Sequence, residues 1–370
     1  MFQPPDYAGG SLLNLIAEIE HRLTGVALAP RLHEPLGRLI EDADTYVLFL
    51  ADGLGARQLS HPGATPLAAS AVGEIDAPFP TTTTVSWATI ATGMAPRQHG
   101  LIGYQLYLPE TDGVVYTIKW TRGWGEDVAV DHDGFLPSPN LWERLSAAGV
   151  EPITVQPGNF AGTKLSSVLY RGCRFEPAYS AEEMVDATVQ LAATTRRFIV
   201  TYLPHIDVAA HVYGQESPEY ADALEFVGRV WEQLVLRLPD GVVMVGTADH
   251  GHIDYPKSQI ASIERADEKG RAFYGDSRAM FVKGDGESLA EYLPATWLPF
   301  AEVSAWWGPG PDHPKFTERA PDGVLMADEG HILMHKHSDD RMVGHHGGLE
   351  PSERRIPLLL AKGSSSTGLS

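Results

Sequence analysis

Short, continuously apolar runs alternate along the chain with longer segments whose apolar residues recur every three or four positions. The first such segment, residues 12–23, has the spacing of an amphipathic helix. The run at 46–51 is apolar throughout, as expected of a strand buried on both faces. Further strands are predicted at 152–155, 198–203, 242–247 and 356–360, and further helices at 140–149, 181–193 and 217–238.

This alternation predicts an α/β fold with a mostly parallel central sheet and helices on both of its faces. Two segments, 104–138 and 255–330, follow no helical period, and we expect them to be insertions over the active site rather than separate domains. We therefore expect a single α/β domain over residues 1–370, with a flexible polar tail at 363–370.

Composition narrows the class of protein. The 8 Trp, 13 Tyr and 12 Phe exclude a disordered chain, and the single cysteine, Cys173, excludes a disulfide scaffold and thiolate zinc sites. The formal charge of −20 argues against a nucleic-acid partner. The N-terminal residues lack a secretory signal, and no apolar run reaches the ~20 residues of a membrane span. We therefore expect a cytoplasmic protein with no membrane partner, and the sequence predicts no oligomeric state.

Polar residues with metal-binding chemistry follow the predicted strands. Asp52 ends the first strand, Asp207 and His211 follow the strand at 198–203, and Asp249-His250 follows the strand at 242–247. His345 and His346 precede the last strand. Each residue alone could be a helix cap or a surface residue, but their common position at strand ends predicts a metal site. Histidine and carboxylate ligands suit Zn²⁺ or Mn²⁺.

Four consecutive threonines, at 81–84, precede a helical segment that runs to Gly93. They are therefore expected at a helix N-terminus, where free N–H groups and the helix dipole favour an anion. A hydroxyl at this position, deprotonated beside a metal, could attack phosphorus.

Taken together, these residues resemble the type I phosphodiesterase/nucleotide pyrophosphatase family of the alkaline phosphatase superfamily. Six segments match the family in order: 50–54, 79–83, 92–93 with 99–100, 207–211, 248–251 and 346–348.

The resemblance implies two divalent ions, with zinc expected and manganese the alternative. One ion would be held by Asp52, Thr83, Asp249 and His250, and the other by Asp207, His211 and His346. The implied reaction is hydrolysis of a phosphodiester or pyrophosphate bond in a small phosphate ester, such as a nucleotide. Thr83 would be the nucleophile and would form a phospho-threonine intermediate.

The sequence departs from the family at Ser86, where the family often has an Asn that holds a phosphoryl oxygen. Ser86 is our candidate substrate-binding residue. A phosphomonoesterase, with Lys119 or Arg122 binding the extra charge, and a phosphonate hydrolase are alternative functions within the same superfamily. A sulfatase is disfavoured, because a threonine stands where its modified residue would be. A non-catalytic metal-binding module is the remote alternative, since the implied ligand set is complete.

Four aromatic residues of the two insertions could stack on a base or aryl group, although packing is the expected role: Tyr107, Trp120, Trp124 and Tyr274.

Overall fold

A seven-stranded sheet forms the centre of the computed structural model, which describes residues 2–111, 113–123, 125–336 and 338–363. Its strands, in spatial order, are β2 (Ala71–Asp76), β19 (Arg355–Lys362), β10 (Val242–Thr247), β1 (Thr45–Ala51), β9 (Arg197–Leu203), β7 (Glu151–Pro157) and β8 (Arg174–Ala178). The sheet is parallel except for β19, which runs antiparallel to both of its neighbours. The predicted mostly parallel sheet is therefore confirmed, with the last strand reversed.

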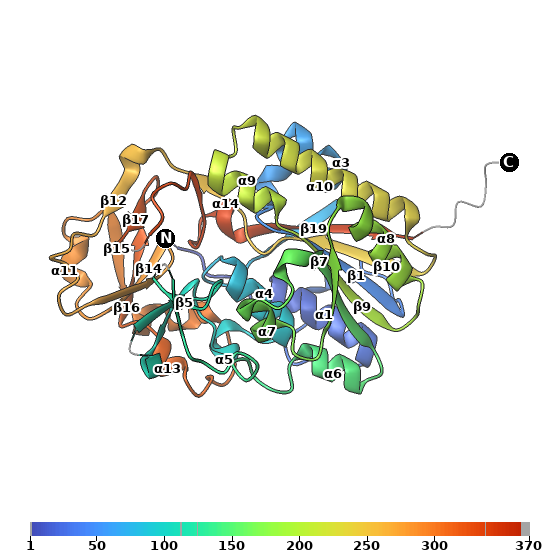
Figure 1. Cartoon of the computed structure of the whole chain (residues 1–370), viewed down its shortest axis with the longest axis horizontal. Helices are drawn as coiled ribbons and strands as arrows, with labels where there is room; N and C mark the ends of the chain where they lie inside the picture. The colour runs from blue at the N-terminus through green and yellow to red at the C-terminus, as the bar shows by residue number, and fades with distance from the viewer. Residues whose placement is uncertain (1, 112, 124, 337, 364–370) are drawn as a thin grey trace.

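Helices cover both faces of this sheet, as predicted (Figure 1). One face carries α1 (Leu12–Thr24), α4 (Thr83–Thr92) and α6 (Leu141–Ala147), and the other carries α3 (Thr65–Ala68), α9 (His205–Tyr213) and α10 (Pro218–Arg237). The twelve-residue helix α8 (Ala181–Ala192) packs against α10.

Local capping explains where these helices begin and end. Asn140 accepts a hydrogen bond from the Glu143 N–H at the start of α6, and Ser217 does the same for Tyr220 at the start of α10. Gly93 ends α4 with φ +62°, a left-handed conformation that favours glycine.

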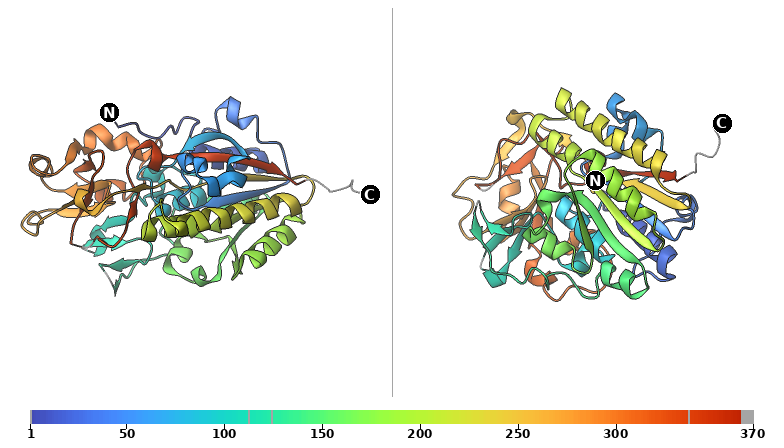
Figure 2. Two further views of the ribbon diagram at one scale, coloured as in Figure 1. Left: turned by 90° about the horizontal axis from the view of Figure 1, so that it is seen from above. Right: turned by 45° about the vertical axis from the view of Figure 1, so that its right-hand side comes forward.

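The two segments expected to be insertions join in a second sheet. Its eight strands, in order, are β15 (Ala295–Pro299), β16 (Gly323–Ala327), β14 (Ala279–Lys283), β13 (Ala272–Gly275), β3 (Gln105–Leu108), β4 (Gly113–Tyr116), β5 (Thr121–Arg122) and β6 (Glu126–Asp127). The two segments meet where Gln105 on β3 pairs with Gly275 on β13. The second sheet lies at one end of the long axis of the molecule, beside the central sheet (Figure 2).

Short elements complete the described chain. Two small sheets pair β11 (Ile253–Asp254) with β18 (Gly344–His345), and β12 (Ile260–Ser262) with β17 (Ile332–Met334). The remaining α-helices are α2 (Glu34–Gly37), α5 (Pro96–His99), α7 (Lys164–Leu169), α11 (Glu287–Ala290), α12 (Phe300–Val303), α13 (Phe316–Arg319) and α14 (Pro351–Arg354). Among the described helices, none has both the length and the apolar character needed to cross a bilayer. The tail expected at 363–370 lies outside the described residues, apart from Gly363.

A buried ion pair links the two sheets. Arg278, between β13 and β14, donates from Nε to Glu353 Oε2 on α14 at 3.4 Å, and both side chains are at most 2% exposed. Glu353 Oε1 accepts the Gly348 N–H at 2.8 Å, and the guanidinium of Arg278 also reaches Glu350. This contact therefore ties the second sheet to the loop that carries His346.

Replacing Glu353 with alanine should lower the free energy of unfolding by about 3–5 kcal/mol, because Arg278 would lose its fully buried partner and keep only the partly exposed carboxylate of Glu350. Chemical denaturation of metal-depleted protein measures this change. Glu350→Ala is the matched control: the Glu350 side chain is 32% exposed, and its loss should cost only about 1 kcal/mol. Equal losses for the two variants would contradict the role assigned to burial.

Candidate metal centre

Seven side chains converge in two groups at the carboxyl edge of the central sheet. The first metal group is Asp52, Asp249 and His250, and the second is Asp207, His211, His252 and His346. Within each group the possible ligand atoms lie within 4.8 Å of one another. The groups adjoin, since the rings of His250 and His346 stack at a centroid distance of 3.8 Å.

The sheet topology explains why the carboxylates meet. Asp52 follows β1, Asp207 lies in the first turn of α9 after β9, and Asp249 follows β10. These three strands are adjacent and parallel, so their carboxyl ends share one edge.

Gly53 permits the closest part of this approach. It has φ +76°, and a Cβ at this position would lie 2.8 Å from Asp207 Cα. The Asp207 N–H donates to the Asp52 carbonyl at 3.1 Å. A side chain at residue 53 would therefore force α9 away from the end of β1.

The first metal group presents carboxylate oxygens that suit a cation. Asp249 Oδ1 accepts the N–H groups of Gly53 and His250, each at 3.0 Å, and the Tyr202 hydroxyl donates to Asp52 Oδ2. The other two oxygens, Asp52 Oδ1 and Asp249 Oδ2, are buried and have no hydrogen-bond donor among the described residues. Each carboxylate is thus oriented through one oxygen while the other remains free for a metal ion.

Three histidines are oriented in a corresponding way by backbone carbonyls. Nδ1 of His211 donates to Gly344 O at 2.7 Å, and Nδ1 of His346 donates to Thr81 O at 2.8 Å. Nδ1 of His250 donates to Gly251 O at 3.1 Å. The Nε2 atom of each ring is then the one that can bind a metal, the arrangement usual for metal-ligating histidines.

Electrostatics also favour cations here. Burial, together with the carboxylates of Asp249 and Asp207, raises the pKa of Asp52 well above its ordinary value. Burial and the neighbouring histidines hold the pKa of His346 well below its ordinary range, so this ring is neutral and able to bind a metal. A divalent ion would offset the repulsion between these carboxylates.

Thr83 is the first residue of α4 and lies beside the first metal group. Its Oγ1 is 3.2 Å from His250 Nε2. The hydroxyls of Thr81 and Thr84 are engaged elsewhere: Thr81 donates to Gly348 O, and Thr84 accepts from Thr117, both at 3.0 Å. Thr82 precedes the helix, and no side-chain cap bond occupies the N-terminus of α4.

The structure thus brings together all seven of the residues expected to hold metal: Asp52, Thr83, Asp207, His211, Asp249, His250 and His346. His345 points elsewhere, since its Nδ1 lies 3.2 Å from Ser277 Oγ.

Ser86 is fully buried, and its hydroxyl donates to Asp249 O at 2.7 Å. In this structure the Ser86 side chain supports the first metal group, and its contact with substrate stays a prediction.

The other residues considered from the sequence lie away from this centre. Lys119 is exposed, and Arg122 donates to the Thr111 carbonyl. Trp120 and Tyr274 are fully buried, as expected of packing residues, and Tyr107 lies against Tyr274 at a ring distance of 5.9 Å. Trp124 lies outside the described residues.

Two residues of the centre were not predicted. His252 Nε2 lies 2.7 Å from Asp207 Oδ1, the same oxygen that His211 Nε2 approaches at 3.3 Å. Its position two residues after His250, at the end of β10, is the signal that could have identified it.

Asp276 lies in the turn between β13 and β14, 3.8 Å from His346 Nδ1, and burial raises its pKa to about 7. No sequence motif surrounds Asp276.

A sequence model of the type I phosphodiesterase/nucleotide pyrophosphatase family matches residues 46–349. No match was found among curated protein sequences.

Solved structures share the fold. Murine ectonucleotide pyrophosphatase/phosphodiesterase 5 is similar with a TM-score of 0.65 and 18% identity, over 85% of this chain and 87% of that chain. Phosphonoacetate hydrolase from Sinorhizobium meliloti 1021, in complex with phosphonoformate, has a TM-score of 0.64 and 18% identity, over 90% and 94% of the two chains. An inactive variant of the murine protein, with a threonine replaced by alanine and in complex with AMP, has a TM-score of 0.64 and 17% identity over 85% and 87%.

Removing bound metal with a chelator should lower the melting temperature, because the carboxylates at the sheet edge would then repel each other without a counterion. Reloading with Zn²⁺ at a hundredfold excess over its Kd should restore about 3 kcal/mol of stability. Calorimetry of chelated and reloaded protein measures the difference. Identical melting temperatures would show that neither metal group binds an ion.

His252→Ala should weaken binding of one of two ions by about 10- to 100-fold, the usual cost of losing a residue that holds or orients a metal ligand. Titration of the chelated protein with Zn²⁺ measures the two affinities. His345→Ala is the matched control, because His345 is buried next to His346 but belongs to neither metal group. Wild-type affinity in the His252 variant would remove His252 from the centre.

Proposed function

The chain belongs to the type I phosphodiesterase/nucleotide pyrophosphatase family, and we propose that it cleaves phosphodiester or pyrophosphate bonds through a phospho-threonine intermediate on Thr83. The observation that carries this proposal is the position of the Thr83 hydroxyl. It lies at the N-terminus of α4, 3.2 Å from His250 Nε2 and beside unpartnered buried carboxylate oxygens.

The residues of the centre suit two divalent ions, for which we propose zinc. Asp52, Asp249 and His250, with Thr83, would hold one ion, and the second metal group would hold the other. When bound, such ions lower the pKa of a hydroxyl and neutralise phosphoryl oxygens. All donors here are histidine nitrogen, carboxylate oxygen or hydroxyl, which zinc accepts.

In the proposed reaction, Thr83 Oγ1 loses its proton and forms a bond to phosphorus. The bond from phosphorus to one ester oxygen breaks, and that oxygen leaves and takes up a proton. Water then forms a bond to the phosphorus of phospho-threonine, and the bond from phosphorus to Thr83 Oγ1 breaks. A proton from the water returns to Oγ1, which restores the Thr83 hydroxyl and releases a phosphomonoester. The N–H groups at the start of α4 would stabilise negative charge on the phosphoryl oxygens in both steps.

The comparisons support this choice of nucleophile and substrate class. The murine relative is inactive when a threonine is replaced by alanine, and that variant was solved with AMP. The other relative was solved with phosphonoformate and phosphonoacetate. Both are small molecules that contain phosphorus and oxygen, as expected of substrates or analogues for this chemistry.

A diester is favoured over a monoester or a carboxylated phosphonate by the surroundings of Thr83. A monoester carries an additional negative charge, which such enzymes usually bind with a cationic side chain. Lys119 and Arg122, the candidates for this role, are not among the described residues that line the cavity beside Thr83. The same argument applies to the carboxylate of a phosphonoacetate-like substrate.

Thr83→Ala should reduce hydrolysis of bis(para-nitrophenyl) phosphate by on the order of 10⁴–10⁶, the usual cost of removing a covalent nucleophile. Metal content should largely survive, because the other ligands remain. Thr83→Ser should retain part of the activity, since it keeps the hydroxyl. Release of para-nitrophenolate, with metal content determined for each variant, measures these effects.

Thr84→Ala is the matched control and should remain near wild type, because the Thr84 hydroxyl faces Thr117. An active Thr83→Ala beside an inactive Thr82→Ala would move the nucleophile by one residue. Full activity in all of these variants would exclude the covalent mechanism.

A further inference from the structure

The loop formed by His346, Gly347 and Gly348, the His346 loop, brings one histidine to the second metal group and is tightly enclosed. Gly347 has φ +110°, and a Cβ at this position would lie 2.5 Å from Asp276 Cβ. A Cβ on Gly348 would lie 2.7 Å from Glu353 Oε2. A side chain at either glycine would therefore displace the loop, and the imidazole of His346 with it.

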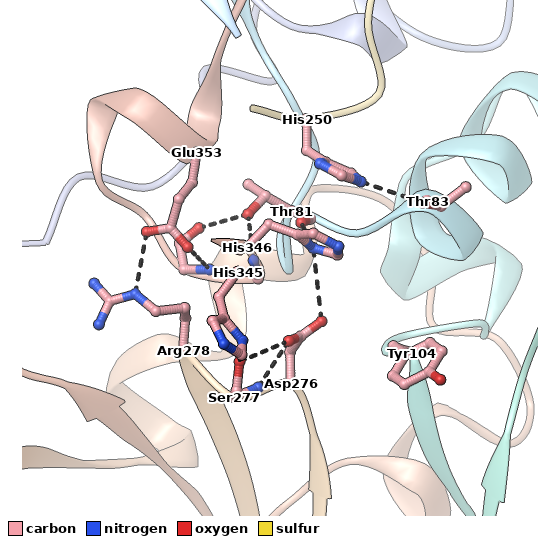
Figure 3. A network of polar contacts seen from close by, with 12 residues as sticks. Thr81, Thr83, Tyr104, His250, Asp276, Ser277, Arg278, His345, His346 and Glu353 are labelled. Atoms are coloured by element: carbon pink, nitrogen blue, oxygen red, sulfur yellow. Dashed lines mark hydrogen bonds and ion pairs between the residues drawn. The ribbon is translucent and has the colours of Figure 1, made fainter. Parts of the chain in front are cut away.

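Thr81 forms three hydrogen bonds with the His346 loop, although the loop lies 265 residues further along the chain. The Thr81 carbonyl accepts from His346 Nδ1 at 2.8 Å. The Thr81 hydroxyl accepts the Gly347 N–H and donates to Gly348 O, both at 3.0 Å. Figure 3 shows Thr81 beside His346 with these contacts. Both hydrogen bonds that the described structure gives to this hydroxyl thus hold the loop.

The Thr81 hydroxyl does not cap the helix that follows it. The N-cap residue of α4 is Thr82, and no side-chain hydrogen bond caps this helix. Thr81 is fully buried, so water cannot replace the hydrogen bonds of its hydroxyl. Without that hydroxyl, the Gly347 N–H and the Gly348 carbonyl would each lose a partner inside the protein.

The acceptor that orients His346 is the Thr81 carbonyl rather than a carboxylate. Asp276 Oδ2 is 3.8 Å from His346 Nδ1, which is longer than a hydrogen bond. A proton held on Nδ1 by a carbonyl leaves the lone pair of Nε2 available for a metal ion. Both the orientation of the His346 ring and its tautomer therefore depend on the position of Thr81.

The same contacts connect the second metal group to the nucleophile segment. Thr83, two residues after Thr81, has its Oγ1 3.2 Å from His250 Nε2. The ring of His250 in turn stacks on that of His346, with the centroids 3.8 Å apart. One short stretch of backbone thus carries the proposed nucleophile and also holds a candidate ligand of the other metal group.

The other side of the His346 loop is held independently. Glu353 Oε1 accepts the Gly348 N–H at 2.8 Å, and Glu353 is paired with Arg278. Loss of the Thr81 hydroxyl should therefore shift the loop locally and leave its attachment to the second sheet in place.

We propose that Thr81 is a positioning residue, whose hydroxyl holds the His346 loop against the start of α4 and so directs His346 Nε2 toward the second metal group. The inference rests on the proposed function, because that function requires an ion at this group. A purely structural role would differ in its effect: loss of the hydroxyl would then lower stability and leave zinc affinity unchanged.

Thr81→Val keeps the shape of the side chain and removes its hydroxyl. Titration of chelated protein with Zn²⁺ should show one of two ions bound about 10- to 100-fold more weakly than in the wild type, the usual cost of losing a group that orients a metal ligand. Thr81→Ser retains the hydroxyl and should recover the wild-type affinity. If the valine variant does not fold, Thr81→Ala should show the same weakening. Wild-type zinc affinity in a folded variant without the hydroxyl would overturn the proposal.

Thr92→Val is the matched control. Thr92 is also fully buried and lies on α4, where its hydroxyl donates to Ala88 O at 2.6 Å. Chemical denaturation of metal-depleted protein should show that both valine variants lose stability, whereas the zinc titration should be altered only in Thr81→Val. Equal losses of zinc affinity would assign the effect to general loosening of this region and would overturn the positioning role.

Hydrolysis of bis(para-nitrophenyl) phosphate separates this inference from the proposed function. At a zinc concentration equal to the wild-type Kd of the weakened ion, Thr81→Val should be at least about fivefold less active, because about a tenth or less of its sites would hold that ion. Excess zinc should restore this activity, since the Thr83 hydroxyl remains, but should not restore Thr83→Ala.

The two proposals can fail separately. If the wild type hydrolysed no diester while the zinc affinities followed the expected pattern, only the proposed function would fail. Diester hydrolysis by the wild type, together with an activity loss in Thr81→Val that excess zinc does not restore, would overturn the inference and leave the proposed function intact.

Discussion

Repulsion between carboxylates that the fold buries side by side is the constraint on which the organisation of this protein depends. The parallel strands β1, β9 and β10 deliver Asp52, Asp207 and Asp249 to one edge, where water is largely excluded. Asp52 and Asp249 are buried and Asp207 is partly buried. Three carboxylates at such short range are unfavourable in their charged forms unless cations accompany them. The surrounding groups leave room for cations. In Asp52 and in Asp249, one carboxylate oxygen accepts a hydrogen bond, from Tyr202 or from backbone N–H groups, and the other oxygen is free.

Much of the central fold could be predicted because its signals are local. A strand buried on both faces needs a continuous apolar run, as at 45–51, and the helices carry their own start signals, as at Asn140 and Ser217. Because strands and helices alternate, the strands run parallel and their carboxyl ends lie at one edge of the sheet. The aspartates and histidines that follow the strands could therefore be expected to converge there. The helix that ends at Gly93 placed the four threonines at a helix N-terminus, and the family resemblance selected Thr83 among them.

Features that depend on distant pairing could not be predicted in the same way. The second sheet is built from strands of two to five residues, too short for a clear alternation. Its halves are joined by the pairing of Gln105 with Gly275 and by the contact of Tyr107 with Tyr274. Asp276 follows β13, so its approach to the metal centre depends on this distant pairing and on the Arg278–Glu353 contact. The antiparallel direction of β19 could not be predicted from its own residues either, since a continuous apolar run has the same pattern in a parallel and in an antiparallel strand. His252 was missed for a different reason: two histidines flank Gly251, and the family motif accounts for only one of them.

The chemistry and the walls around it come from separate parts of the chain. The candidate metal-binding side chains lie on connections next to the central sheet. Most of the facing wall of the cavity beside Thr83 comes from the insertions, and the Arg278–Glu353 pair is a buried bridge between the two parts. Evolution can therefore diversify the two parts at different rates. Substitutions in the insertions can redirect such an enzyme to a new ester while leaving its reactive centre intact. Substrate preference can therefore change through a series of variants that all remain active. For protein engineering, the second sheet is accordingly the segment to randomise.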